Sequence, residues 1–284
     1  MPSLRDIKRR IRSVENTKQI TRAMQMVAAA KLRRAQQRVE AARPYAGKMQ
    51  EMLQSLAGAA ANLAHPLFDV REGNRHALAV FTSDRGLCGS YNANIIRRAT
   101  AFVQEGPRGE KLIVPIGKKG YDWFKSRPWP LGLHYLDWQG NLDFERVKQI
   151  TRYLLDLFES RKVDRVSLLY TQFISTVSYR VTLDAFLPIT PPGGGHAGTE
   201  EFIFEPNPEA IFGRLLPAYA LSRVQTAMAE ALASEHGARM FAMSNATNNA
   251  SEMIENLTLV RNKARQASIT KEMLEIVGGA EALT

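Results

Sequence analysis

The sequence of 284 residues contains a single cysteine, Cys88, and no run of about 18 consecutive apolar residues. One cysteine excludes a disulfide framework and a zinc site built from several cysteines, so we expect a protein of a reducing compartment. Without a long apolar run, the sequence predicts no membrane-spanning helix. Glycine (19 residues) and proline (13 residues) are too scarce for a fibrous or low-complexity chain.

Acidic residues are scarce near the N-terminus, and the charge of the chain is therefore uneven. Residues 1–60 contain 13 Lys/Arg and 4 Asp/Glu, so they carry +9 of the net charge of +10. Nucleic acid, an anionic membrane surface and an acidic protein partner are each compatible with this excess. We do not interpret the basic start as a targeting segment, because no apolar stretch follows it and Asp6 and Glu15 interrupt it.

Neither proline nor glycine occurs between Ser3 and Arg43, and an apolar pattern with alternating spacings of three and four residues runs through this block. Such a pattern predicts a coiled-coil helix that needs a partner of similar length. Fourteen of the seventeen positions are apolar: Leu4, Ile7, Ile11, Val14, Lys18, Thr21, Gln25, Ala28, Leu32, Ala35, Val39, Ala42, Ala46, Met49, Leu53, Leu56 and Ala60.

The last block supplies the predicted partner. Asn207 and Pro208 have the residue types of a helix N-cap and first helical position, and Gly278 and Gly279 predict the end of the helix. This helix is longer than the first, so its C-terminal end is expected to project as a single helix. Its predicted seam consists of Met243, Ala246, Ala250, Met253, Leu257, Val260, Ala264, Ala267 and Leu274.

Between the two helices, strand patterns alternate with helix patterns, which predicts a mostly parallel sheet covered on both faces. The expected strands are Ala77–Thr82, Leu112–Ile116, Arg165–Gln172, Tyr179–Phe186 and Glu201–Phe204, and the expected helices are Asn92–Gln104, Gly120–Lys125 and Phe144–Ser160. The predicted fold class is therefore α/β plus a long coiled coil: an antiparallel two-helix coiled coil (residues 1–60 and 207–284) with an inserted α/β domain (residues 61–206).

No motif in the sequence predicts catalysis, a metal or a cofactor. Gly193, Gly195 and Gly198 have the spacing of a dinucleotide-binding fingerprint but lack a preceding strand and a following helix, so we reject that site. Ser83–Ser90 follows a strand and precedes a helix but lacks the phosphate-loop pattern; we interpret it as a tight turn, with ligand binding as the alternative. The five histidines have no metal-ligand spacing.

Two other function classes stay open on the residues alone. A DNA-binding coiled coil would place its basic segment ahead of its seam, whereas here the heptads run through the basic residues from Leu4 onward, so we predict no nucleic-acid partner. A stand-alone α/β enzyme would need a set of catalytic residues, and none stands out.

Three long motifs resemble those of the gamma subunit of F-type ATP synthases. They are Ser13–Lys31 near the N-terminus, Ser83–Gly89 after the first strand, and Asn262–Thr270 continuing to Glu275–Ala280 near the C-terminus. The resemblance covers essentially the whole chain. It implies a coiled coil with an inserted Rossmann-like domain that acts as a rotor shaft and has no active site of its own.

The same resemblance implies the partners. In this family the shaft turns inside a hexamer of alpha and beta subunits, and its foot rests on the epsilon subunit and the c-subunit ring, at the cytoplasmic face of a bacterial membrane. Contacts with the hexamer are implied for Arg22, Met24, Lys31, Arg239, Arg265, Gln266, Thr270 and Glu272, and foot contacts for Phe204 and Glu205. Chloroplast relatives carry an inserted cysteine pair as a redox switch; since this chain has only Cys88, we expect no such switch.

Overall fold

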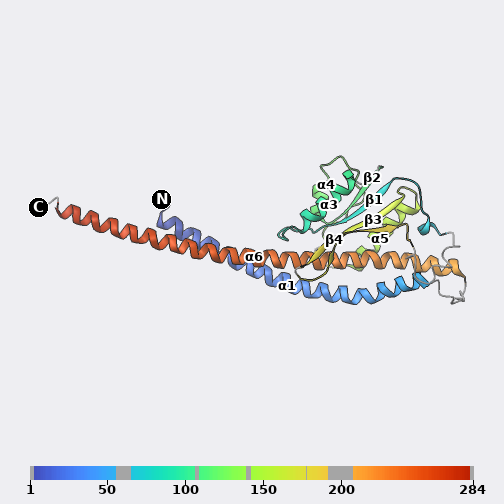
Figure 1. Cartoon of the computed structure of the whole chain (residues 1–284), viewed down its shortest axis with the longest axis horizontal. Coiled ribbons are helices and arrows are strands. Elements are labelled where there is room, and N and C mark those ends of the chain that lie inside the picture. The colour runs from blue at the N-terminus through green and yellow to red at the C-terminus, as the bar shows by residue number, and fades with distance from the viewer. Residues whose placement is uncertain are drawn as a thin grey trace. The chain divides into compact units, whose positions relative to one another are not determined.

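A computed structural model of the chain describes residues 3–55, 65–105, 109–138, 142–176, 178–190 and 207–281 (Figure 1). The chain forms two compact units. The smaller consists of Met1–Ala28 and Met240–Thr284, and the larger of Ala29–Arg239. The two long helices, α1 (Leu4–Ser55) and α6 (Pro208–Glu281), each contribute a segment to both units.

The ends of the long helices follow from local capping. At the start of α1 the backbone N–H of Asp6 donates to Ser3 Oγ at 3.2 Å, and at the start of α6 the N–H of Ala210 donates to Asn207 Oδ1 at 2.8 Å. The predicted N-cap at Asn207 is confirmed, and Ser3 caps α1 in the same way. The predicted stop at Gly278 and Gly279 is wrong, because α6 continues to Glu281. Glycine inside a helix costs only about 1 kcal/mol relative to alanine, so a glycine pair alone does not force an end.

The larger unit contains a four-stranded sheet in the order β2-β1-β3-β4. Strands β1 (His76–Phe81), β2 (Lys111–Ile116) and β3 (Arg165–Phe173) are parallel, and β4 (Tyr179–Leu187) is antiparallel to β3. Four of the predicted strands are thus confirmed to within a residue or two at each end, together with the mostly parallel sheet. The fifth, Glu201–Phe204, lies outside the described residues.

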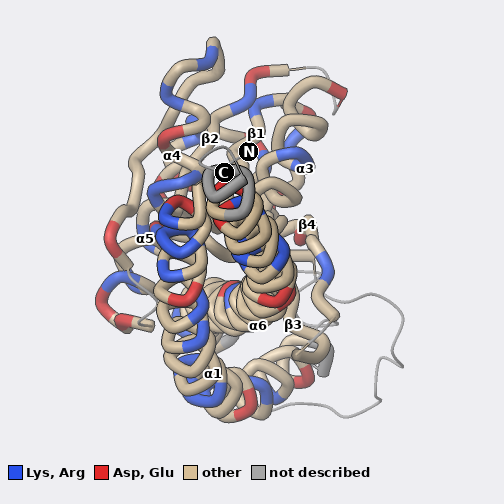
Figure 2. The backbone as a smooth tube through the Cα atoms, turned by 90° about the vertical axis from the view of Figure 1, so that its left-hand side faces the viewer, with Lys and Arg blue, Asp and Glu red and all other residues tan. Residues whose placement is uncertain are grey.

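Helices cover both faces of this sheet, as right-handed crossovers require. Figure 2 shows α3 (Tyr91–Glu105) and α5 (Phe144–Glu159) on opposite sides of the strands, and α4 (Lys118–Phe124) follows β2. The three predicted helices of this block are therefore confirmed. The core under α3 joins Leu78, Val80, Ile95, Ile113 and Leu169, all fully buried. A short 3-10 helix, Pro66–Phe68, precedes the sheet.

Within the larger unit, α6 is buried nearly all round. Every residue from Ala227 to Ala238 is buried, because the sheet lies on one side of the helix and α1 on another. On α1, Leu32, Ala35, Val39 and Leu53 are at most 3% exposed.

The smaller unit is a pair of antiparallel helices. The predicted seam pattern holds along α1 but only in part along α6. Every predicted seam position of α1 from Leu4 to Leu53 is buried or half-buried, so the pattern on α1 is confirmed. On α6, Met243, Ala250, Leu257 and Ala264 face the seam as predicted, but the alternate positions lie one residue later than predicted. Thr247, Ile254, Arg261 and Ser268 are buried or half-buried there, whereas the predicted Met253, Val260 and Ala267 are exposed; the predicted Ala246 is half-buried, next to the buried Thr247.

Candidate functional site

The C-terminal end of α6 extends past the start of α1 within the smaller unit. Thr21 and Thr247 face each other across the seam with their hydroxyl oxygens 2.8 Å apart. Because both helices rise equally per residue, Leu4 lies about level with Ala264. Every residue from Ile269 to Ile276 is exposed, which confirms the predicted projecting helix.

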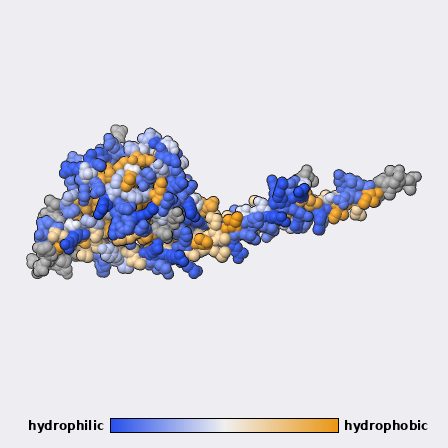
Figure 3. Space-filling view, turned by 180° about the vertical axis from the view of Figure 1, so that it is seen from behind, coloured by the Kyte–Doolittle hydropathy of each residue, from blue (hydrophilic) through white to orange (hydrophobic). Residues whose placement is uncertain are grey.

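This projecting segment carries many apolar side chains that nothing in the described chain covers. Figure 3 shows apolar patches among hydrophilic side chains along the slender two-helix unit. The exposed fractions are 50% for Ile269, 61% for Met273, 67% for Leu274 and 72% for Ile276. A row of exposed Leu, Ile and Met on one helix is typical of a surface that another protein covers.

The residues implied as hexamer contacts on this segment all point to solvent. Arg265, Gln266, Thr270 and Glu272 are exposed. Their polar contacts are local: Thr270 Oγ1 donates to the Gln266 carbonyl at 3.0 Å, and Glu272 Oε1 accepts from Ser268 Oγ at 3.1 Å. None of the four contributes to the seam, so their side chains are available to a partner.

On α1, the implied contact residues lie on a strongly basic helix. Lys and Arg recur along α1, as Figure 2 shows. Arg22 and Lys31 are exposed, whereas Met24 is half-buried beside the seam. Phe204 and Glu205, the implied foot contacts, lie outside the described residues.

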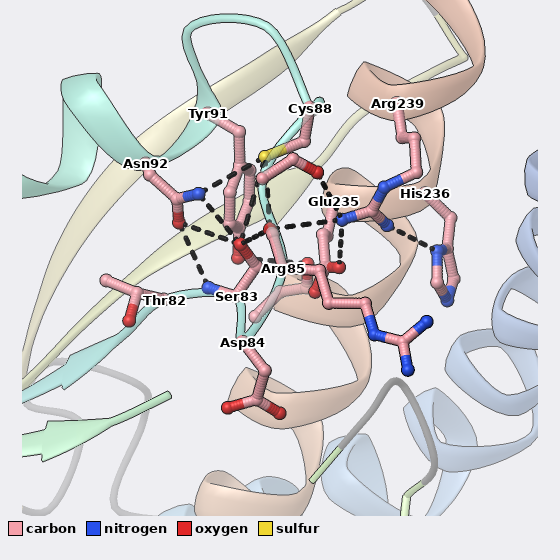
Figure 4. Close-up of polar contacts among 12 residues, drawn as sticks. Thr82, Ser83, Asp84, Arg85, Cys88, Tyr91, Asn92, Glu235, His236 and Arg239 are labelled. Carbon is pink, nitrogen blue, oxygen red and sulfur yellow. Dashed lines mark hydrogen bonds and ion pairs between the residues drawn. The ribbon is translucent and has the colours of Figure 1, made fainter. Parts of the chain in front are cut away.

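The turn that follows β1 is held by a hydrogen-bonded network rather than shaped as a cradle for an anion (Figure 4). Asn92, in the first turn of α3, donates from Nδ2 to Ser83 Oγ at 2.7 Å and to Cys88 Sγ at 3.2 Å, and its Oδ1 accepts from the Ser83 backbone N–H. Leu87 adopts φ 61°, the left-handed region that favours glycine. This arrangement supports the interpretation of the segment as a tight turn.

The side chain of Arg239 of α6 binds the backbone of this turn. Its guanidinium forms an ion pair with Glu235 Oε1 at 2.7 Å and donates to the carbonyl oxygens of Arg85 at 3.4 Å and Gly86 at 3.3 Å. Nη1 also lies 3.3 Å from His236 Nδ1. The Arg239 side chain is 13% exposed and that of Glu235 7%, so Arg239 is occupied inside the chain, unlike the other implied contact residues.

The charge states of this cluster follow from burial. Burial raises the pKa of Glu235, and the neighbouring Arg239 charge opposes that rise. Burial, together with the charges of Arg239 and Lys31, lowers the pKa of His236 to about 4, so the imidazole is neutral at pH 7. Neutral His236 accepts from Arg239 at Nδ1 and carries its proton on Nε2. Burial also raises the pKa of the Cys88 thiol, which is 2% exposed and therefore an unreactive side chain.

Sequence reasoning did not find Glu235 and His236 as members of this cluster. The available signal was the spacing of Glu235 and Arg239, which places opposite charges on one face of a helix one turn apart. That spacing is common on exposed helices, and only the burial of this part of α6 makes the pair unusual.

The described part of the chain contains neither a cluster of metal-ligating side chains nor a membrane-spanning helix. Over those residues there is no group of three or more His, Cys, Asp and Glu side chains that could hold a metal ion. No helix among them is both long and apolar enough to cross a membrane.

Comparison with known proteins gives consistent matches over the whole length. A family described as ATP synthase matches residues 3–283. The ATP synthase gamma chain of Desulforamulus reducens is 46% identical over 284 residues, and that of Heliobacterium modesticaldum is 45% identical over 291 residues; each match covers both chains completely. Among solved structures, a chain from the central stalk and c-ring of the Tetrahymena thermophila mitochondrial ATP synthase is 28% identical. That match has a TM-score of 0.64 and covers 80% of this chain and 99% of the other.

Proposed function

The chain belongs to the gamma-chain family of ATP synthases, and we propose from this premise how its own residues serve the central stalk. A gamma chain is a subunit of the rotor of the ATP synthase, which couples ion transport to the synthesis or hydrolysis of ATP. The fold has the parts that this work requires: a two-helix shaft and an α/β domain.

One observation carries the proposal for the shaft: the end of α6 projects beyond α1 with apolar side chains 50–72% exposed. Burying such a side chain is worth about 1.5–3 kcal/mol, so a helix of this kind favours an apolar sleeve over water. We propose that the alpha and beta subunits form that sleeve. Apolar contacts are non-directional, so they permit the shaft to turn against its sleeve.

Residues on both long helices are the proposed points of contact with the hexamer. Basic residues on α1 would attract acidic segments of the beta subunits and set the direction of approach. The proposed contacts are Arg22, Met24 and Lys31 on α1, and Arg265, Gln266, Thr270 and Glu272 on α6. Arg239 is different, because its guanidinium is bound inside the chain; we propose that it acts on the hexamer through the turn that it holds.

For the foot of the stalk, we propose that Phe204 and Glu205 contact the epsilon subunit and the c-subunit ring. The chain would then be peripheral to the membrane, on the cytoplasmic side in a bacterium, and attached only through the complex. The functional division into 1–60, 61–206 and 207–284 is part of the same proposal. We also propose that the chain has no catalytic activity and takes no cofactor, so that ATP binds to the hexamer alone.

The shaft proposal is tested by the double variant Gln266→Ala/Thr270→Ala. Both side chains are exposed, and each truncation removes about 0.5–1.5 kcal/mol of hydrogen bonding to a partner without altering the seam. We expect ATP-driven proton pumping by the reconstituted complex to fall while the melting temperature of the isolated chain stays unchanged.

The matched control is Asn248→Ala/Glu252→Ala, a second exposed pair four residues apart on α6. It should leave both pumping and melting unchanged. A large drop in melting temperature with intact pumping in the Gln266→Ala/Thr270→Ala variant would show that these residues stabilise the helix pair, and the contact assignment would then be wrong.

A further inference from the structure

The face of α6 that lies against the α/β domain carries small side chains. Ala227, Ala231 and Ala238 recur along this face, and each is at most 4% exposed. Ala238 packs into the core under α3. A helix keeps its position against a neighbouring element largely because side chains of one surface fit between those of the other. Methyl groups form only shallow ridges, so packing alone resists rotation and sliding of α6 weakly.

Two buried hydroxyl groups join this smooth face to the domain. Tyr91, at the start of α3, donates from its hydroxyl to the carbonyl oxygen of Ala231 at 3.2 Å. Ser234 Oγ donates to the carbonyl oxygen of Thr171, in β3, at 3.0 Å. The side chains of Tyr91 and Ser234 belong to residues that are each 1% exposed. Because a buried hydroxyl that loses its partner is costly, these bonds favour one relative position of the helix and the domain.

Two arginines make contacts of the same kind further along α6 in each direction. Arg223 forms an ion pair with Asp184 Oδ2 at 2.7 Å and donates to the carbonyl oxygen of Ala185, in β4, at 2.6 Å. Arg239 binds the turn after β1, as described above. At about 1.5 Å per residue, these two arginines lie about 24 Å apart along the helix. Polar contacts therefore hold α6 against the domain at four positions, each of which uses a backbone carbonyl oxygen as an acceptor.

The bond of Ser234 specifies both the rotation and the axial position of α6. Moving the helix by one residue requires a rotation of about 100° and a shift of about 1.5 Å, and it would place Ala233 or Glu235 opposite Thr171. A shift by a full turn, of three or four residues, would bring an alanine, a glycine or a glutamate there instead. None of these side chains carries a hydroxyl. Only the observed position therefore keeps the bond between α6 and β3.

We propose that Tyr91 and Ser234 are positioning residues of the rotor, which fix the angle of α6 against the α/β domain so that torque passes between the domain and the shaft without slack. Torque on the shaft tends to turn α6 against the domain. The alanines of this face oppose that motion weakly, whereas the hydrogen bonds oppose it directly. This inference rests on the rotor function and adds to it the residues that join its two parts.

Single-molecule rotation of the assembled complex tests the proposal. The alpha and beta subunits are fixed to a surface, and a bead is attached through Arg98→Cys, an exposed position on α3; the native Cys88 is 2% exposed and stays unlabelled. At low ATP concentration, the variance of the bead angle during pauses measures the torsional compliance between the hexamer and the α/β domain. We expect Tyr91→Phe/Ser234→Ala to increase this variance, by up to about twofold if the four contacts share the restraint equally. The rotation rate at saturating ATP with a small bead should stay unchanged.

The matched control makes the same two chemical changes within the α/β domain. In Tyr135→Phe/Ser160→Ala, one lost bond is that of the Tyr135 hydroxyl to the Gln149 carbonyl at 3.2 Å, and the other is that of Ser160 Oγ to the Asp156 carbonyl at 2.5 Å. Neither bond involves α6, so the variance should equal that of the wild type. The control thereby separates the positioning of α6 from a general loss of hydrogen bonds in the domain.

Ser234→Ala alone carries the test if the double variant does not assemble, because it removes a single oxygen atom from a helix and leaves the Tyr91 ring in place. A variance equal to that of the control, in both the double and the single variant, would overturn the inference while leaving the rotor function intact. Absence of ATP-driven rotation with the wild-type chain would contradict the rotor function, and this inference with it.

Discussion

Removing the guanidinium of Arg239 tests whether the contact between α6 and the turn after β1 stabilises the larger unit. In Arg239→Ala, Glu235 stays buried but loses an ion-pair partner at 2.7 Å, and the carbonyl oxygens of Arg85 and Gly86 lose a donor. Removing one partner of a buried ion pair costs about 3–5 kcal/mol, because the other charge is left uncompensated. Arg239 is slightly exposed, so we expect the lower end, about 3 kcal/mol at pH 8.

The cost should be smaller at low pH, for two reasons that act in the same direction. Glu235 has a raised pKa in the folded chain, so its contribution to stability falls as pH rises from its unfolded value of about 4.3 through its folded value. Without Arg239 the folded pKa rises further, and protonation at pH 5 then relieves the loss. His236 has its pKa lowered to about 4, partly by Arg239, so the variant also loses less stability than the wild type when pH falls below about 6.5.

Urea unfolding followed by tryptophan fluorescence measures this effect in the right part of the molecule. The three tryptophans, Trp123, Trp129 and Trp138, all belong to the larger unit, and Trp138 Nε1 donates to the Thr82 carbonyl beside the turn. Lys148→Ala is the control: it breaks the exposed Lys148–Glu145 pair on α5, so it should cost less than about 1 kcal/mol. A loss for Arg239→Ala no larger than the control, or equal at pH 5 and pH 8, would refute this account of the cluster.

Three further predictions follow from single residues and from the absence of a phosphate-loop pattern. Gly237→Ala should stabilise the larger unit by up to about 1 kcal/mol in the same urea assay, because alanine favours the helix and a Cβ there meets its nearest atoms at 3.7–3.9 Å, without a clash. Gly213→Ala is the reference for helix propensity alone, because a Cβ there meets nothing within 4 Å. Calorimetry on the isolated chain should show no binding of ATP at micromolar concentration, and a stoichiometric heat would contradict the non-catalytic assignment. Dithiol reduction should leave the ATPase activity of a complex without other redox-active subunits unchanged, because Cys88 is buried and has no second cysteine to pair with; a severalfold change that Cys88→Ser abolishes would show the opposite.

The parts of the fold that the sequence predicted well are those where residue types contrast sharply. Strands β1 and β2 contain continuous apolar runs, Ala77–Phe81 and Leu112–Ile116, and both lie in the buried parallel part of the sheet. On α1, large aliphatic residues such as Ile7, Ile11 and Leu32 alternate with charged ones, so only one set of positions can form the seam, and that set is buried. In these segments the burial of one face decides the structure, and the sequence displays that face directly.

Along α6 the contrast between apolar and polar positions is weak, and the predicted seam positions of this helix were partly wrong. Alanine and other small residues occur on several sides of this helix, so spacings of three-then-four and four-then-three fit almost equally well. The structure selects the second, because Thr247 meets Thr21 across the seam and Ile254 follows one heptad later. Met253 and Val260 are left 51% and 46% exposed as a result.

The even spread of small residues around α6 also explains why the sequence did not reveal the buried Glu235–Arg239 pair. A pattern of small residues does not indicate which side of a helix is buried. It therefore predicts neither the position of the seam nor the burial of an ion pair. The seam needs only one row of side chains on α6, and that row includes Thr247, Arg261 and Ser268. Met253 and Val260 therefore contribute nothing to the pairing of the helices. Their exposure extends the apolar surface of α6 to the part that lies alongside α1.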